Sequence, residues 1–389
     1  MQALAFASGI LVIRLLPVHE YGLYTIANTV LGTIVMLADM GVSSGVMSQG
    51  GKVWKNPAAL GAVLATGMAL RRKFSFYSLL AGVPVLLYLF HKHDASWLAS
   101  ALLVVSLVPA FAMTLSGSIF EIPLKLHQEI VPLQKIQISS NILRLFLNAL
   151  ALFVFPYAAI AVAIGGAAQL VTNIRLRSLS RNRADTTQPI DPVACGEILK
   201  IVRRSVPMGI YLSILNNSYL WLISIFGTTA AVAQVGALGR LAIVLSVFQG
   251  VFSSVIAPRF ARFPDSPSRL ARRFFAIEAV LLVLGILIVA AVWVYPNETL
   301  WVLGGNYSSL QTEVVLMAAW ASIGLVRNGI FSLNSARGYI GNPWVIIPVN
   351  LAFVIAAYLI FPPVDTKSAL CAALAGSIPG PFIQTLVFL

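Results

Sequence analysis

The sequence is poor in charge: only 10% of its 389 residues are Asp, Glu, Lys or Arg, while 59% are hydrophobic. A soluble domain carries roughly 25% charged residues, so this chain has too few of them to cover a water-facing surface. A helix needs about 20 mostly apolar residues to cross the hydrocarbon core of a bilayer. The long apolar runs therefore predict an integral membrane protein, with no room left for a large soluble domain.

Cysteines and soluble-enzyme motifs are also scarce. The two cysteines, Cys195 and Cys371, cannot make a disulfide framework or a metal cluster, and the four histidines fall in predicted loops. The sequence contains no P-loop, no nucleophile elbow and no HExxH motif. We therefore expect no enzyme activity, no metal and no cofactor, and no ATP hydrolysis to drive transport.

The apolar runs predict an all-α protein with about twelve transmembrane helices. We expect two six-helix lobes around a central cavity, covering residues 1–174 and 205–389. A basic cytoplasmic linker at 175–204 joins them, and its part at 195–204 has the pattern either of an interfacial amphipathic helix or of a plain solvated linker. The predicted helices cover 2–16, 21–45, 74–90, 96–120, 136–155, 157–174, 205–226, 230–257, 274–295, 312–335, 343–361 and 367–389.

The basic residues predict the orientation of these helices. The net charge of +13 would suggest nucleic acid in a soluble protein, but here the positive residues alternate between loops. The loops predicted inside, at 52–73, 121–135, 175–204 and 259–273 and around Arg337, hold 20 Lys and Arg residues. The outer loops hold two. By the positive-inside rule, both termini should be cytoplasmic, and we expect no nucleic-acid partner.

Four arginines lie inside predicted helices: Arg14, Arg144, Arg240 and Arg327. A charge at the bilayer centre costs at least about 2.5 kcal/mol, so these side chains should face a polar cavity or a partner. Arg14, near an outer helix end, has the alternative of snorkelling to the headgroups. Because buried cations outnumber buried anions, the four arginines indicate a site for an anion.

The context of Arg144 is the most specific. Gln134, Gln137, Asn141 and Asn148 join it at steps of three and four residues, which places all five on one helix face. We include Gln137, Asn141 and Asn148 among the candidate substrate-binding residues. A polar stripe of this kind either faces water and substrate or forms a hydrogen-bonded seam between helices.

Two carboxylates, Asp39 and Glu278, also lie in predicted helices, near the inner membrane face. Protonation of such a group can follow the conformational state of a transporter, so both are candidates for ion coupling. The alternative is an interfacial carboxylate that pairs with a Lys or Arg of a nearby loop.

Several short patterns resemble one known family. The runs RLLPVHEYGLY at 14–24 and LADMG at 37–41 resemble the opening of polysaccharide-biosynthesis flippases. These proteins belong to the multidrug/oligosaccharidyl-lipid/polysaccharide exporter (MOP) superfamily and include O-antigen flippases. GALGR at 236–240, APR at 257–259 and LGGNY at 303–307 sit where such proteins carry similar patterns. The chain departs from the family in lacking a basic amino-terminal flank and in ending abruptly at Leu389, so we expect a shortened chain.

The resemblance implies a flippase in a bacterial cytoplasmic membrane. Its substrate would be a polyprenyl-pyrophosphate-linked oligosaccharide, an O-antigen or capsule repeat unit, moved to the outer leaflet by alternating access. Arg144, Arg240 and Arg327 would meet the pyrophosphate, and guanidinium groups can pair with it in bidentate fashion. Further expected partners are membrane lipid and a polysaccharide polymerase or assembly machinery. The alternatives are an ion-coupled drug or metabolite exporter of the same superfamily, and a membrane-embedded glycosyltransferase or ligase.

Overall fold

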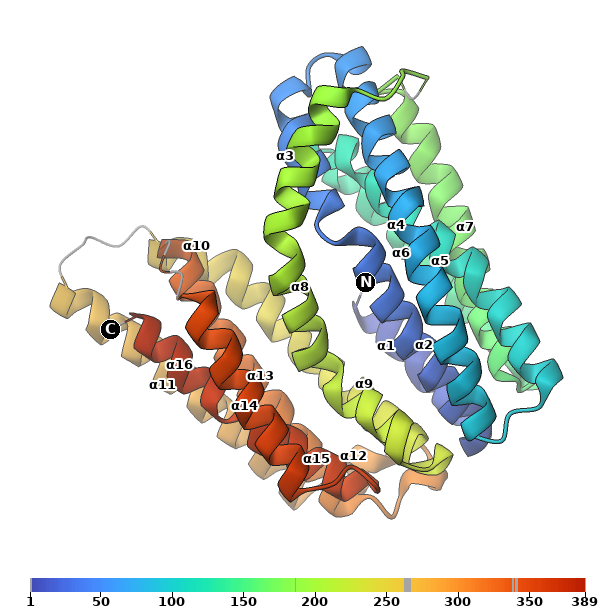
Figure 1. Cartoon of the computed structure of the whole chain (residues 1–389). Helices are drawn as coiled ribbons and strands as arrows, with labels where there is room; N and C mark the ends of the chain where they lie inside the picture. The colour runs from blue at the N-terminus through green and yellow to red at the C-terminus, as the bar shows by residue number, and fades with distance from the viewer. Residues whose placement is uncertain (1, 186, 262–266, 338, 340–341, 389) are drawn as a thin grey trace. The chain divides into compact units, whose positions relative to one another are not determined.

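A computed structural model of the chain describes residues 2–185, 187–261, 267–337, 339 and 342–388, and its regular elements are all helices (Figure 1). Nine helices in this part of the chain are long and apolar enough to cross a membrane. Three shorter apolar helices, at Gln2–Leu15, Asn217–Phe226 and Trp344–Ile360, bring the number of apolar segments to twelve. The structure confirms an all-α integral membrane protein with about twelve membrane helices in two units.

The first compact unit holds residues 3–217. At its centre is α5, which packs against α2, α3, α4 and α7. α8 begins in this unit, and its residues from 218 onward belong to the second one. The helices are α1 (Gln2–Leu15), α2 (Val18–Asp39), α3 (Val42–Val53), α4 (Pro57–Lys92), α5 (Trp97–Leu126), α6 (Ile130–Val154), α7 (Ala158–Arg181) and α8 (Pro192–Phe226).

The second unit holds residues 218–389 and is built around α13, which packs against α9, α11, α15 and α16. α5 and α13 correspond to the fourth helix predicted for each half. Its elements are α9 (Thr229–Val251), the π-helix η1 (Phe252–Ile256), α10 (Ala257–Ala261), α11 (Pro267–Val294), α12 (Pro296–Trp301), the 3₁₀ turn η2 (Gly305–Tyr307), α13 (Gln311–Arg337), α14 (Pro343–Ile360), α15 (Thr366–Ser377) and α16 (Pro379–Phe388).

The predicted inner loop at 52–73 was wrong for most of its length. α2 ends at Met40 and Gly41, whose φ angles of 37° and 90° are left-handed, and α3 follows directly. Asn56 then caps α4 by accepting hydrogen bonds from the next backbone amides, and Pro57 occupies the first turn. α4 continues for 36 residues, about 54 Å at 1.5 Å per residue, so Arg71, Arg72 and Lys73 lie within a helix.

The predicted linker at 175–204 is also mostly helical, because α7 runs to Arg181 and α8 begins at Pro192. The short connection between them is fastened to α4. The Asp185 amide donates to the Pro57 carbonyl (2.9 Å), and the Asp191 amide donates to the Thr66 hydroxyl (2.9 Å). The compact units divide at 217/218, whereas we had expected the second lobe to begin at residue 205.

The segment 195–204 is a helix, but its apolar side does not face lipid as expected. Ile198 is fully buried and Val202 nearly so, in a core cluster with Val42 and Val46 of α3 and residues of α4. Gly45 of α3 permits this close approach, since a Cβ there would lie 2.9 Å from the Ile198 Cγ2 atom. The first turns of α8 are therefore part of the first unit.

Two smaller differences concern the second unit. The predicted helix at 367–389 is interrupted at Ile378, which separates α15 from α16. The predicted helix at 230–257 contains the π-helical turn η1 near its end. Residues 262–266 of the predicted inner loop at 259–273 lie outside the described residues.

Candidate functional site

The polar stripe predicted around Arg144 lies on α6 and contacts three other helices of the first unit. Gln137 donates to the Glu121 carboxylate of α5 (2.8 Å), and Asn148 donates to the Ser8 hydroxyl of α1 (3.1 Å). Asn141 donates to the Gln137 carbonyl of its own helix (2.9 Å). Gln137 and Asn148 therefore make the contacts of a helix–helix seam.

Arg144 differs from its neighbours in the stripe. Its Nη2 donates to the hydroxyl of Tyr24 on α2 (3.3 Å), which is a neutral partner. Its Nε is buried and has no hydrogen-bond partner in the described part of the chain, where no carboxylate pairs with it either. A guanidinium carries five donors, so Arg144 keeps the capacity to bind an anion.

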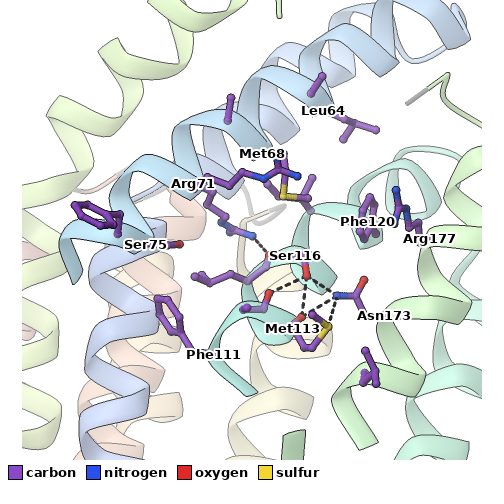
Figure 2. A pocket seen from close by; sticks show the side chains of 18 of the residues that line it. Leu64, Met68, Arg71, Ser75, Phe111, Met113, Ser116, Phe120, Asn173 and Arg177 are labelled. Carbon is purple, nitrogen blue, oxygen red and sulfur yellow. Dashed lines mark hydrogen bonds between the residues drawn. The ribbon is translucent and has the colours of Figure 1, made fainter. Parts of the chain in front are cut away.

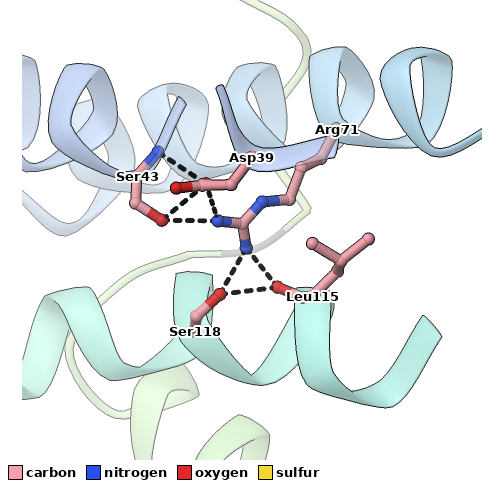
Figure 3. A network of polar contacts seen from close by, with 5 residues as sticks. All are labelled: Asp39, Ser43, Arg71, Leu115 and Ser118. Carbon is pink, nitrogen blue, oxygen red and sulfur yellow. Dashed lines mark hydrogen bonds and ion pairs between the residues drawn. The ribbon is translucent and has the colours of Figure 1, made fainter. Parts of the chain in front are cut away.

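A buried ion pair that the sequence did not predict joins four helices of the first unit. Arg71 of α4 is only 2% exposed and pairs with Asp39 at the end of α2. The guanidinium also donates to the hydroxyls of Ser43 on α3 and Ser118 on α5, the latter at 2.5 Å, and to the Leu115 carbonyl (Figure 3). The carboxylate in turn accepts from the Ser43 hydroxyl (2.8 Å).

Asp39 is thus paired with an arginine, although the arginine comes from a helix and not from a loop. One signal in the sequence pointed to this helix: residues 58–70 hold no charged side chain and directly follow Pro57, a residue typical of a first helical turn. The pairing itself carries no local signal, because Asp39 and Arg71 lie far apart in the sequence.

Glu278 has different surroundings. It lies on α11 of the second unit, where one carboxylate oxygen accepts a hydrogen bond from the Thr385 hydroxyl of α16 (3.0 Å). Its other oxygen, Oε2, is buried and has no hydrogen-bond partner in the part of the chain that the structure describes. Within those same residues no cation pairs with it, so Glu278 remains a candidate for ion coupling.

The structure does not bring the other candidate arginines onto the stripe of α6. Arg14 is exposed on α1 of the first unit. Arg240 of α9 and Arg327 of α13 are half-buried and belong to the second unit. The Arg327 Nε donates to the Asn328 side chain (3.4 Å), and its methylene groups pack against Gly380 of α16.

Comparison with solved structures relates the whole chain to one group of transporters. It is similar to an inward-facing multidrug resistance MATE family transporter of the MOP superfamily, with a TM-score of 0.70, 15% identity and coverage of 100% of this chain and 94% of the other. It is likewise similar to the lipid II flippase MurJ in an inward closed conformation, with a TM-score of 0.74, 14% identity and coverage of 100% and 84%. For the eukaryotic MATE transporter AtDTX14 the TM-score is 0.60, the identity 13% and the coverage 99% and 94%.

These similarities define the fold of the chain. No protein-family model and no curated protein sequence matches the chain. The chain is a multi-pass membrane protein with the fold of MOP-superfamily transporters, a fold shared by a lipid flippase and by drug transporters.

Proposed function

We propose that this chain is a flippase for a polyprenyl-pyrophosphate-linked oligosaccharide, an O-antigen or capsule repeat unit. It moves the head group across the bacterial cytoplasmic membrane by alternating access, while the prenyl tail stays in lipid. Both termini are cytoplasmic, and a polysaccharide polymerase or assembly machinery takes up the product. The fold supports this proposal, since the lipid II flippase MurJ shares it.

The proposal rests on the surroundings of Arg144, which has a neutral hydrogen-bond partner and no carboxylate partner among the described residues. A cation at membrane depth is costly unless something compensates it, and a neutral tyrosine hydroxyl does not. A pyrophosphate provides the missing negative charge and can accept several guanidinium hydrogen bonds at once. In this proposal Arg240, Arg327 and Arg14 are further contacts to the anionic part of the substrate during the cycle.

Transport in proteoliposomes tests the proposal. Purified protein is reconstituted with a fluorescent polyprenyl-pyrophosphate oligosaccharide, and a membrane-impermeant quencher reports its transbilayer movement. A hydrogen bond to a charged group contributes about 1.5–3 kcal/mol, so Arg144→Ala should slow transport by roughly 10- to 150-fold. The matched control is Arg203→Ala, which removes an exposed arginine of α8 and should leave the rate unchanged.

The possible outcomes distinguish a wrong function from a wrong anion-binding residue. Movement in the wild type that falls only in Arg144→Ala supports both. Equal movement in all three proteins keeps the flippase and rejects Arg144 as its anion contact. A folded wild type that moves no lipid-linked sugar contradicts the proposed function.

Glu278 favours a second candidate function, an ion-coupled exporter of drugs or metabolites. A carboxylate paired only with a hydroxyl can bind an organic cation or exchange a proton with the conformational cycle. Efflux of a fluorescent organic cation from the same vesicles, driven by a pH gradient and lost in Glu278→Gln, supports the exporter over the flippase.

A further inference from the structure

A cavity of about 880 Å³ lies between α4, α5 and α7 of the first unit, apart from the stripe on α6 (Figure 2). Its walls are mainly apolar and include Leu79, Val108 and Phe111. Two further lining residues, Phe76 and Ile174, are 65% and 61% exposed, so the cavity opens to the surroundings of the unit. Large exposed apolar side chains of this kind are typical of a surface that contacts a membrane.

The level of the cavity in the bilayer follows from the helix lengths. About 20 helical residues cross the hydrocarbon core. Counted from Phe90, the last apolar residue of α4 before His91 and Lys92, this length reaches Arg71, next to Arg72. Counted from the outer start of α7 at Ala158, it reaches Arg177. The two arginines, which both line the cavity, therefore lie at the inner boundary of the hydrocarbon core.

Most polar groups in the depth of the cavity are already paired within the protein, apart from the Arg71 Nε atom, which has no hydrogen-bond partner among the described residues. Arg71 is held by Asp39, and Asn173 donates to the Ser116 hydroxyl and to the Met113 carbonyl (Figure 2). Arg72 and Arg177 are different, because both are exposed and neither makes an ion pair or a hydrogen bond within the described part of the chain. The cavity thus combines apolar walls with two uncompensated positive charges at headgroup level.

We propose that this cavity is a binding site for an anionic glycerophospholipid of the inner leaflet. An acyl chain lies against Phe76, Val108, Phe111 and Ile174, and the phosphate lies between Arg72 and Arg177. Basic pockets between membrane helices on the cytoplasmic side recognise anionic headgroups in this way. The site is separate from the proposed substrate contacts on α6 and does not depend on which molecule the protein transports.

Native mass spectrometry of the purified full chain in detergent tests the site. The protein is titrated with phosphatidylglycerol and, separately, with phosphatidylcholine. Each basic residue near a membrane surface contributes about 1 kcal/mol, so the double variant Arg72→Gln/Arg177→Gln should bind phosphatidylglycerol about 30-fold more weakly. The matched control Lys73→Gln/Arg181→Gln removes two exposed charges from the same helices but outside the cavity, and it should bind like the wild type.

A third variant tests the cavity itself. Ala112→Trp fills the space next to Ser116 without changing any charge, and it should also weaken phosphatidylglycerol binding. If the double variant fails to fold, Arg177→Gln alone, at the exposed end of α7, should weaken binding about fivefold.

Four results would overturn the proposal. These are equal binding of the two lipids, equal losses in the double variant and its control, and unchanged binding in Ala112→Trp. The fourth is displacement of phosphatidylglycerol by an equimolar polyprenyl diphosphate, which would make the cavity a site for the transported lipid. Because this experiment measures binding alone, a failure of the proposed transport function leaves its result unaffected.

Discussion

Two carboxylates that look alike in the sequence, Asp39 and Glu278, have opposite surroundings in the structure. Asp39 pairs with the buried Arg71 and shares a network with hydroxyls and a carbonyl from two further helices, α3 and α5. Glu278 has one hydrogen bond, from Thr385, and one buried oxygen with no partner in the described part of the chain. Asp39 compensates a charge that would otherwise be buried alone, whereas no cation among the described residues lies beside the Glu278 carboxyl group.

These different surroundings predict different roles for Asp39 and Glu278. Removing one member of a buried ion pair is strongly destabilising because the other charge is left in a medium of low polarity. Removing the Glu278 carboxylate should cost less free energy of folding, because it accepts one hydrogen bond and pairs with no cation among the described residues. We therefore expect Asp39 to matter chiefly for stability and Glu278 chiefly for the transport cycle. Four substitutions follow in decreasing order of their expected effect on the free energy of unfolding: three test this contrast, and Asn148→Ala provides a buried neutral hydrogen bond for comparison.

Asp39→Ala should have the largest effect, about 3–5 kcal/mol of destabilisation, because it leaves Arg71 buried and unpaired. The measurement is the free energy of unfolding in detergent micelles from a denaturant titration. The double variant Asp39→Ala/Arg71→Met serves as the control and should recover most of the loss. If Asp39→Ala is as stable as the wild type, the hydroxyls and the carbonyl are sufficient to stabilise the buried Arg71 guanidinium.

Asn148→Ala should have the next largest effect, a loss of about 1–3 kcal/mol in the free energy of unfolding. Asn148 is completely buried and donates to Ser8 of α1, so truncation leaves that hydroxyl without its partner. The matched control is Asn141→Ala on the same helix, which loses only a bond to its own backbone and should change stability by less. Equal losses in the two variants would contradict a seam between α6 and α1.

Thr385→Val should cost about 1 kcal/mol, since it removes the hydrogen bond that Glu278 accepts from α16. The same titration measures this loss. The double variant Thr385→Val/Glu278→Ala, compared with both single variants, shows whether the two side chains act together, because each substitution removes the same hydrogen bond and the two losses should not add. Additive losses would mean that the hydrogen bond contributes nothing to stability.

Glu278→Gln should have the smallest effect on stability, below about 0.5 kcal/mol, because the amide oxygen still accepts from Thr385. Its effect should instead appear in transport measured in proteoliposomes between pH 5 and 8. We expect the rate to lose its dependence on pH, since glutamine cannot exchange a proton. An unchanged pH dependence rejects ion coupling at this residue, and a loss of stability as large as that of Asp39→Ala removes the contrast between the two carboxylates.

The helices that hold the candidate site were largely predictable. α6 and its polar stripe follow from spacing alone, because residues three and four apart share a helix face whatever the surroundings. The loop predicted at 52–73 was wrong because three adjacent basic residues suggested a solvated segment. α4 extends beyond the hydrocarbon core, so Arg72 and Lys73 reach the headgroup level while Arg71 turns into the unit. Hydropathy alone does not show that a helix continues beyond the point where it leaves the hydrocarbon core.

Hydropathy, spacing and charge were enough to predict the membrane class, the all-α fold, the approximate number of membrane helices and the unusual position of Arg144 inside one of them. Each of these follows from a local property: the apolar length needed to cross a bilayer, the periodicity of a helix, or the cost of a charge at membrane depth. The pairing of Asp39 with Arg71, and the absence of a cation beside Glu278 among the described residues, came from the packing of the helices. The same packing also decided that Ile198 packs on Gly45, and that Arg72 and Arg177 line one cavity. Those facts depend on which helices meet, and residues distant along the chain leave no joint pattern in a single sequence.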